Sequence, residues 1–275
     1  MTDYPALAAR AREFTALHVP GDPILLPNAW DAASAWAIAQ AGAKAIATSS
    51  AACAWSIGRA DGNVMTRDEA LTQIRRIVAA VDLPVTADVE TGYGDDADLA
   101  QSVREVIEVG AVGVNLEDSG GDPLYPIDVA ARRISIARQA AEGVGVPLHI
   151  NARVDVFFAP VGEPDDRVRL TAERAAAYIA AGASSIFVPG VRDLVTIKAL
   201  TEAIDAPVNI LAGAATPPLA ELAAAGVGRV SVGSSLNLAM LKTLTDAART
   251  LLTTGSFAAL GGIPYPELNG YFAGR

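Results

Sequence analysis

Three acidic residues that end two consecutive apolar segments are the side chains best suited to chemistry. Asp88 and Glu90 end the segment Pro84–Glu90, and Glu117 ends the segment Val112–Glu117. Side chains two positions apart on a strand point to the same side, so Asp88 and Glu90 share a face. Crowded carboxylates repel one another unless a cation or protons intervene, and Mg²⁺ prefers such hard oxygen ligands. The three acids predict a divalent metal site, with Mg²⁺ expected and Mn²⁺ as a substitute; structural ion pairs with Arg or Lys are the alternative.

A guanidinium and two hydroxyls complete the candidate ligand-binding groups. Arg153 ends a later apolar segment, and a guanidinium can bind a carboxylate through two parallel hydrogen bonds. It could also simply neutralise Glu117 or Asp155, and both roles could hold together. Ser49 and Ser50 end an earlier segment, where their hydroxyls and backbone N–H groups could cradle an anion. Serine is also common at such positions as an ordinary turn residue.

The segment Ala51–Asn63 is expected to be a long loop. Loops on the catalytic side of a barrel often act as lids that exclude water. Asp61 within it could act as a base or hold the lid, and an exposed turn acid is the alternative. We expect His149 to be a core residue, and Cys53 to be a small packing residue because no histidine lies near it in the sequence.

Short apolar runs and longer helical patterns alternate along the chain and place these residues. The expected strands are Ile24–Pro27, Ala45–Ser50, Pro84–Glu90, Val112–Glu117, Leu148–Asp155, Ser185–Pro189, Val208–Ala212 and Arg229–Gly233. The expected helices are Arg67–Val81, Ala97–Val109, Val129–Glu142, Arg167–Ala181, Leu194–Ile204, Leu219–Ala225 and Asn237–Leu252. Eight such units in this length predict an α/β fold, a single (β/α)₈ TIM barrel with its site at the carboxyl ends of the strands.

The whole chain, residues 1–275, is expected to form one domain. Residues 256–275 form a C-terminal extension beyond the eighth helix, which either caps the barrel or reaches a neighbouring subunit. The alternating glycine and proline at the helix-to-strand junctions support a repeated βα unit.

The composition excludes several classes of protein. A formal net charge of -10 without a basic tract argues against nucleic-acid binding. No uncharged run approaches the roughly 20 residues that span a bilayer, and Met1–Arg12 lacks a signal-peptide apolar stretch. The single cysteine excludes an intrachain disulfide. A cytoplasmic protein without nucleic-acid or membrane partners is expected.

Together these segments resemble the isocitrate lyase and phosphoenolpyruvate mutase superfamily. The resemblance runs from about Leu26 to Gly233, and its most specific part is similar to the family's metal-binding D-x-D-T-G-Y-G motif. Four segments carry it: Asp88–Gly94, Leu116–Asp118, Ala152–Asp155 and Ser56–Asp61, the last similar to the segment with the family's gating-loop aspartate.

The resemblance implies a role for each candidate residue. The metal ligands, direct or through water, would be Asp88, Glu90 and Glu117. The substrate-binding residues would be Ser49, Ser50, Asp88 and Arg153. The catalytic residues would be Asp61, Glu117 and Arg153. The family stabilises an enolate-like pyruvyl species, and the cation absorbs the developing negative charge. A homo-oligomer, either a dimer or a tetramer with an exchanged C-terminal segment, is also implied.

The sequence departs from the family pattern in ways that bear on the reaction. Glu90 replaces the usual second aspartate, and Ser50 stands where glycine is usual. The lyases' catalytic cysteine loop and the mutases' Lys-Thr-Asn-rich segment are both absent after Glu117. Phe187–Gly190 offers no histidine where mutases have one. Standard isocitrate cleavage and ordinary phosphonopyruvate formation are therefore disfavoured.

Three functions follow as hypotheses. The first is a Mg²⁺-dependent carbon–carbon lyase or decarboxylase acting on a small 2-oxo or 2-hydroxy acid, with oxaloacetate-like decarboxylation the most economical reaction. The second is a phosphonopyruvate-type mutase or hydrolase that acts on a carbon–phosphorus bond. The third is a protein that binds a 2-oxo acid with little turnover. The sequence does not name the substrate.

Overall fold

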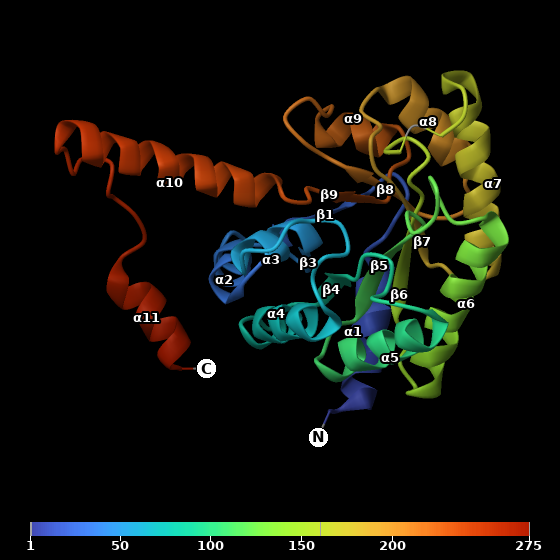
Figure 1. Cartoon of the computed structure of the whole chain (residues 1–275), viewed down its shortest axis with the longest axis horizontal. Helices are drawn as coiled ribbons and strands as arrows, with labels where there is room; N and C mark the ends of the chain where they lie inside the picture. Colours follow the sequence, from blue (N-terminus) through green and yellow to red (C-terminus); the bar gives the residue numbers. More distant parts are fainter. Residues whose placement is uncertain (1, 160, 275) are drawn as a thin grey trace.

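A computed structural model describes residues 2–159 and 161–274, and within them a parallel sheet curls into a barrel (Figure 1). Its strands are β1 (Ile24–Leu26), β2 (Asn28–Ala29), β3 (Ile46–Thr48), β4 (Val85–Asp88), β5 (Gly113–Glu117), β6 (His149–Arg153), β7 (Ser185–Val188), β8 (Val208–Leu211) and β9 (Arg229–Ser231). Every pairing is parallel, in the order β1-β9-β8-β7-β6-β5-β4-β3-β2. The predicted α/β TIM barrel is confirmed.

Pro27 explains why nine strands are found where eight were expected. The expected first strand, Ile24–Pro27, corresponds to β1, which pairs with β9 and ends before Pro27, whereas β2, which pairs with β3, begins after Pro27 and was not expected. Proline has no N–H to donate to a ladder, so it interrupts a strand where it stands. Because β1 and β2 are consecutive in the chain, they bring the ends of the sheet together.

Helices cover the outside of the barrel. They are α2 (Ala32–Gln40), α4 (Arg67–Ala79), α5 (Asp96–Glu108), α6 (Ile127–Gly143), α7 (Arg167–Ala180), α8 (Leu194–Ala203) and α9 (Leu219–Ala224), with a 3₁₀ turn, η1 (Pro164–Asp166), before α7. Side chains start several of them: Thr66 and Glu69 form a reciprocal capping box at the start of α4. The main core lies between the sheet and these helices and is built largely from Ala, Val, Ile and Leu.

Helices α1 and α3 are among those that lie outside the expected ranges. Helix α1 (Tyr4–Ala16) packs against β6 and buries Phe14 completely. Helix α3 (Ser50–Ser56) occupies the first half of the segment that was expected to be a loop, so that expectation was wrong for residues 51–56. Ser49 starts α3 by accepting a hydrogen bond from the backbone N–H of Ala52 at 3.3 Å.

The expected eighth helix, which is α10, and the described part of the C-terminal extension, residues 256–274, lead away from the barrel after β9. Helix α10 (Ser235–Thr254) runs outward from β9, and α11 (Tyr265–Ala273) turns back, as Figure 1 shows at its left. The hydroxyl of Tyr271 donates to the carbonyl of Ala80, and its ring lies 5.9 Å from that of Trp36. The two helices therefore form an arm that touches the barrel near its tip.

Within the described part of the chain, no helix has both the length and the apolar character needed to cross a bilayer.

Candidate active site

Asp88 stands at the end of β4 and is held by the strand and helix before it. Its Oδ2 accepts hydrogen bonds from the hydroxyl of Ser50 at 2.7 Å and from the Ser50 backbone N–H at 3.2 Å. Its own backbone N–H donates to the hydroxyl of Thr48 at 2.8 Å. Ser50 therefore contacts Asp88 directly, whereas the hydroxyl of Ser49 is used to cap α3.

Glu117 and Arg153 face each other across the ends of β5 and β6, where they are register partners. Arg153 Nη1 lies 2.6 Å from Glu117 Oε2, and its Nε donates to Asp155 Oδ1 at 2.6 Å. The other oxygen of Glu117 accepts from Ser119 at 2.5 Å. Burial lowers the pKa of Arg153, but the carboxylates of Glu117 and Asp155 outweigh that effect and raise it. Of the two roles considered for Arg153, the ion-pairing one is therefore present.

Burial raises the pKa of Glu117 to about 7, and the negative charge of Asp88 adds to this, while Arg153 opposes it.

The position of Arg153 is also fixed by aromatic rings: its guanidinium lies 5.1 Å from the centroid of Phe158 and 6.0 Å from that of Phe187. The guanidinium is thus held at the barrel mouth with one N–H group engaged by each of two acids.

Glu90 contacts the loop between α3 and α4. Its Oε1 accepts a hydrogen bond from the backbone N–H of Asn63 at 2.8 Å, and the hydroxyl of Thr91 donates to the Asn63 side-chain oxygen at 2.8 Å. The second oxygen of Glu90, Oε2, is buried and has no hydrogen-bond partner in the described structure. Burial raises the pKa of Glu90, and the charges of Asp88 and Asp61 contribute. Asp61 itself lies exposed on this loop.

The donor set fits a hydrated divalent cation, although it forms no ready-made cage. Among the described residues, no three His, Cys, Asp or Glu side chains gather closely enough to hold a metal ion. Yet Asp88 and Glu90 have no ion-pair partner within the described ranges, and Glu90 Oε2 is an orphaned buried acceptor. The alternative of structural ion pairs thus accounts for Glu117 alone. Mg²⁺ commonly keeps several waters and takes only a few carboxylate ligands, so a donor set without a closed cage suits it.

Arg133 was missed by sequence reasoning, yet it holds the loop that follows β4. From α6, its Nη2 donates to the carbonyl oxygens of Thr91 at 2.6 Å and Gly94 at 3.1 Å, and its Nη1 pairs with Asp96 at 3.0 Å. The loop needs such support because Glu90 and Tyr93 both adopt positive φ, at 51° and 61°. No sequence signal marks this arginine, since its partners are mainly carbonyl groups.

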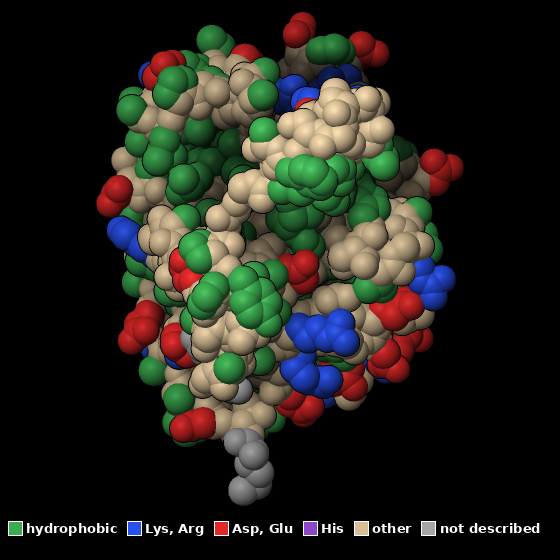
Figure 2. Space-filling model, turned by 90° about the vertical axis from the view of Figure 1, so that its left-hand side faces the viewer, with side chains coloured by type: hydrophobic (Ala, Val, Ile, Leu, Met, Phe, Trp, Pro, Cys, Tyr) green, Lys and Arg blue, Asp and Glu red, His purple; other side chains and the backbone are tan. Residues whose placement is uncertain are grey.

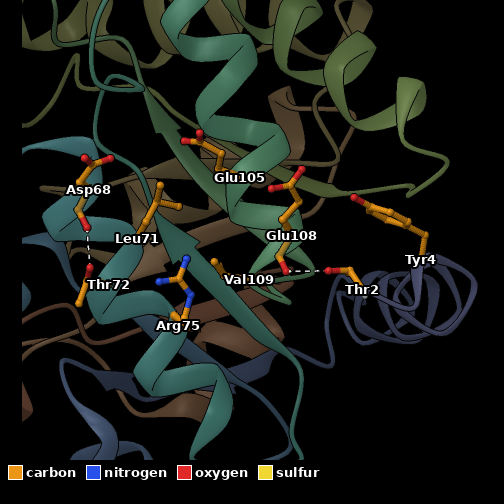
Figure 3. Close-up of a pocket in the computed structure, with 9 residues that line it drawn as sticks. All are labelled: Thr2, Tyr4, Asp68, Leu71, Thr72, Arg75, Glu105, Glu108 and Val109. Carbon is orange, nitrogen blue, oxygen red and sulfur yellow. Dashed lines mark hydrogen bonds between the residues drawn. The ribbon is translucent and has the colours of Figure 1, made fainter.

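A groove outside the barrel is separate from this site. It has a volume of about 570 Å³ and lies between α4, α5 and the N-terminal residues, as Figure 3 shows. Its charged lining residues are Asp68, Arg75, Glu105 and Glu108. A polar surface groove of this kind lacks the apolar walls and convergent groups of a ligand pocket, so we assign it no function.

A parallel barrel with carboxylates and a guanidinium at the carboxyl ends of its strands has the architecture of a (β/α)₈-barrel enzyme. The chain matches the phosphoenolpyruvate phosphomutase family over residues 14–252. An uncharacterised protein of Mycobacterium tuberculosis (strain H37Rv) is 35% identical over 257 residues, which are 93% of this chain and 94% of that protein.

Two further relatives have more informative descriptions. A crystal structure from Burkholderia cenocepacia J2315, provisionally assigned as a phosphonomutase, is 46% identical with a TM-score of 0.84, and the match covers 87% of this chain and 99% of that one. An oxaloacetate decarboxylase of Chromohalobacter salexigens is 31% identical over 198 residues, 69% of this chain and 66% of that enzyme. The chain belongs to the phosphoenolpyruvate phosphomutase family, within the superfamily that also contains the isocitrate lyases, so the family resemblance is confirmed. The relatives are lyases, decarboxylases and mutases, and the chain is an enzyme of this lyase-type superfamily.

Proposed function

We propose that the protein is a divalent-metal-dependent carbon–carbon lyase or decarboxylase that acts on a small 2-oxo or 2-hydroxy acid. One observation carries this proposal. Glu117 forms an ion pair with Arg153, whereas the carboxylate of Asp88 in the same site has no cationic partner among the described residues. One side of the mouth thus offers a guanidinium to an anionic ligand, and the other offers carboxylates to a cation.

In this proposal Asp88, Glu90 and Glu117 would hold Mg²⁺ or Mn²⁺, directly or through water. The bound cation supplies Lewis-acid stabilisation of negative charge on the 2-oxo oxygen. Arg153 binds the substrate carboxylate, and the Asp155 contact keeps its fork in place. In decarboxylation of an oxaloacetate-like acid, the bond between C3 and the leaving carboxylate breaks and CO₂ is released. The electron pair of that bond forms the enolate. A proton from water then adds to C3 to give the product.

The loop between α3 and α4 would exclude water while this enolate exists. Asn63 ties the loop to Glu90 and Thr91, and the charge of Asp61, two residues earlier, contributes to the raised pKa of Glu90. Premature protonation and loss of a reactive intermediate are what such a cover prevents. Asp61 is proposed as the acid or base that this loop brings to the ligand.

A substrate panel tests the proposal. Purified protein would be incubated with oxaloacetate, 2-methylisocitrate and phosphonopyruvate, with Mg²⁺, with Mn²⁺ or with a chelator. Metal-dependent pyruvate release from oxaloacetate or 2-methylisocitrate is expected. Phosphate release from phosphonopyruvate would instead favour the carbon–phosphorus reaction, which the relative from B. cenocepacia makes the second candidate. Tight pyruvate binding without turnover on any substrate would indicate a binding protein and contradict the lyase proposal.

The arm supports a further proposal, that the protein is a homo-oligomer. Asn237 is the one buried residue of α10, whereas Leu238, Leu241 and Leu244 are all exposed, the last by 61%. Figure 2 views the molecule from the arm's side and shows hydrophobic side chains gathered around a hollow.

The barrel has a complementary gap. An apolar groove of about 610 Å³ runs beside β1 and includes Leu17, Ile24 and Leu25, with Leu25 47% exposed. The helix after the last strand would normally cover this outer face, but α10 contributes only Leu236, in its first turn, to the lining of the groove. We therefore propose that α10 of a second copy occupies the groove, giving a dimer or tetramer with exchanged helices.

A further inference from the structure

The interior of the barrel contains an arginine that the proposed reaction does not use. Arg229, on β9, is fully buried and is the largest side chain with so little exposure. Its Nη2 donates to Asn115 Oδ1 at 3.1 Å, while its Nε and Nη1 have no hydrogen-bond partner in the described structure. Burial lowers the pKa of Arg229 to about 9, and the charge of Asp88 opposes this.

Arg229 determines which way the amide of Asn115 faces. A guanidinium has five donors and no acceptor, so the atom that it contacts on Asn115 must be the oxygen. The same oxygen accepts a second hydrogen bond, from Asn151 Nδ2 at 2.9 Å. With its oxygen engaged by β6 and β9, Asn115 has only its NH₂ group left to offer.

The hydrogen bonds beyond Asn151 reinforce this orientation. Because Asn151 donates through its nitrogen, its oxygen accepts from the Ser185 hydroxyl, at 2.6 Å. Ser185 then accepts from His149 Nε2 at 2.8 Å, and His149 Nδ1 accepts from the Thr15 hydroxyl at 3.2 Å. Each member has one consistent donor and acceptor role, so the chain from Thr15 to Arg229 holds Asn115 in a single orientation.

The position of Asn115 places its free NH₂ group beside the site. Asn115 is the register partner of Asp88 on β4, and it lies two residues before Glu117 on the same strand and face. Its side chain is 6% exposed, and its nitrogen makes no hydrogen bond within the described ranges. This nitrogen is not among the side-chain atoms sealed from solvent without a partner, so a ligand can reach it and would gain a donor that is already oriented.

We propose that Asn115 is a further substrate-binding residue that donates a hydrogen bond to an oxygen of the bound 2-oxo acid, and that Arg229 is the positioning residue that orients it. This inference rests on the proposed function, since it concerns the same ligand. It adds a neutral donor beneath the ligand to the charged groups at the rim of the barrel.

The test compares Asn115→Asp with Asn209→Asp by calorimetric titration of oxalate and pyruvate in the presence of Mg²⁺. Asn115→Asp keeps an acceptor for Arg229 but removes the donor. Asn209, on β8, is also fully buried but bonds only to Ser231 in the described structure, so Asn209→Asp adds the same charge to the same interior without touching the proposed contact. We expect Asn115→Asp to weaken oxalate binding at least tenfold relative to Asn209→Asp. Equal affinities in the two variants would overturn the inference while leaving the proposed function intact, whereas a wild-type protein that neither binds nor turns over any 2-oxo acid would overturn both.

Arg229→Met and Arg229→Lys provide a second measurement that does not depend on the folding of the Asn115 variant. Methionine removes the donor that orients the amide, and lysine retains one. We expect the KM to rise several-fold in Arg229→Met and to be largely restored in Arg229→Lys, with similar melting temperatures. An unchanged KM in Arg229→Met, or an equal rise in both variants, would contradict the positioning role.

Discussion

At the scale of single residues, the site combines one acid that has a cationic partner, Glu117, with two that have none among the described residues, Asp88 and Glu90. Glu117 has Arg153 and Ser119 as partners, so its charge is compensated within the protein. Asp88 accepts only neutral donors, and Glu90 leaves one oxygen without a partner in the described structure. Buried charge without a counter-charge is unfavourable. This imbalance is the physical reason to expect a cation here.

Substitution of Asp88 tests that expectation directly. Asp88→Ala removes the carboxylate that faces Ser50 but no apolar packing, so the barrel should remain folded. We expect binding of Mg²⁺ together with a 2-oxo acid to be lost, at least a hundredfold, in isothermal titration. Asp165→Ala, at an exposed acid in η1, is the control and should bind normally. Unchanged binding by Asp88→Ala would remove the basis for the metal site.

Arg153→Lys asks whether geometry or charge matters at the rim. Lysine keeps the positive charge but cannot contact Glu117 and Asp155 through a planar fork. We expect ligand affinity to fall by about 1–3 kcal/mol, measured by the same titration. Equal affinity would show that a point charge is sufficient.

At the scale of elements, two contacts tie peripheral segments to the barrel. Asn63 joins the loop between α3 and α4 to the end of β4 through both its backbone and its side chain. Its φ of 61° lies in the left-handed region, which asparagine tolerates better than most residues. Helix α1 is joined to the sheet at the other end through His18 and His149, whose rings stack at 3.9 Å.

Asn63→Ala should loosen the loop. The change removes the acceptor for Thr91 and places alanine at a positive φ, while Asn63→Gly removes the same acceptor without the strain. We expect limited trypsin digestion at the exposed Arg59 to be several-fold faster in Asn63→Ala than in the wild type, with Asn63→Gly between them. Identical digestion rates in all three proteins would show that Asn63 does not restrain the loop.

The buried histidine pair should make the fold sensitive to acid. Burial lowers the pKa of His18 from 6.5 to about 3, and Arg229 contributes; the pKa of His149 is lowered for the same first reason, with His18 and Arg229 adding to it. Because the unfolded chain takes up protons below pH 6.5 and the folded chain does not, stability is highest above that pH and falls as the pH decreases toward 3. His18 alone should cost roughly 2 kcal/mol between pH 6.5 and 5.

Urea denaturation at pH 7.5 and at pH 5 measures this effect. His18→Gln removes one titrating group, so the loss in the free energy of unfolding between the two pH values should be smaller than in the wild type. An equal loss in both proteins would assign the acid sensitivity to other groups.

At the scale of the whole molecule, the arm is the feature that a lone barrel leaves unexplained. Helix α10 has 20 residues, of which one is buried, so packing against its own chain stabilises it little and leaves its leucines exposed to water. The groove beside β1 is an apolar surface of the barrel that is likewise left uncovered. Both are resolved if two copies exchange α10.

Leu244→Glu tests the exchange. A charge on the exposed face of α10 would have to be buried in the partner's groove, so the oligomer should dissociate. We expect light scattering after size-exclusion chromatography to give a dimer or tetramer mass for the wild type and a monomer mass for Leu244→Glu. Val195→Glu, at an 83% exposed residue of α8, should keep the wild-type mass. A monomeric wild-type protein would contradict the proposal.

The sequence by itself determined the barrel and the positions of its rim residues. The alternation of apolar strands with helical patterns reflects local periodicity and burial, which are readable along the chain. Asp88, Glu117 and Arg153 could be assigned to strand ends for the same reason, and the structure places them there. Glu90 was expected to end the same strand as Asp88, which was wrong, because β4 ends at Asp88 and Glu90 lies in the turn after it at a φ of 51°. Helices α1 and α3 were not predicted. For α3 the reason is that it has few residues and depends on its Ser49 cap.

Only the tertiary structure decided which of these groups are paired and which are not. That Arg153 contacts Glu117, that Arg133 holds the loop after β4, and that Arg229 orients Asn115 are facts about residues 36, 42 and 114 positions apart. Contacts between such distant residues depend on how strands curve and side chains reach across an interior, and no periodicity in the sequence encodes them. The outward path of α10 is likewise not encoded in its local sequence pattern, which predicts a helix but not where it lies.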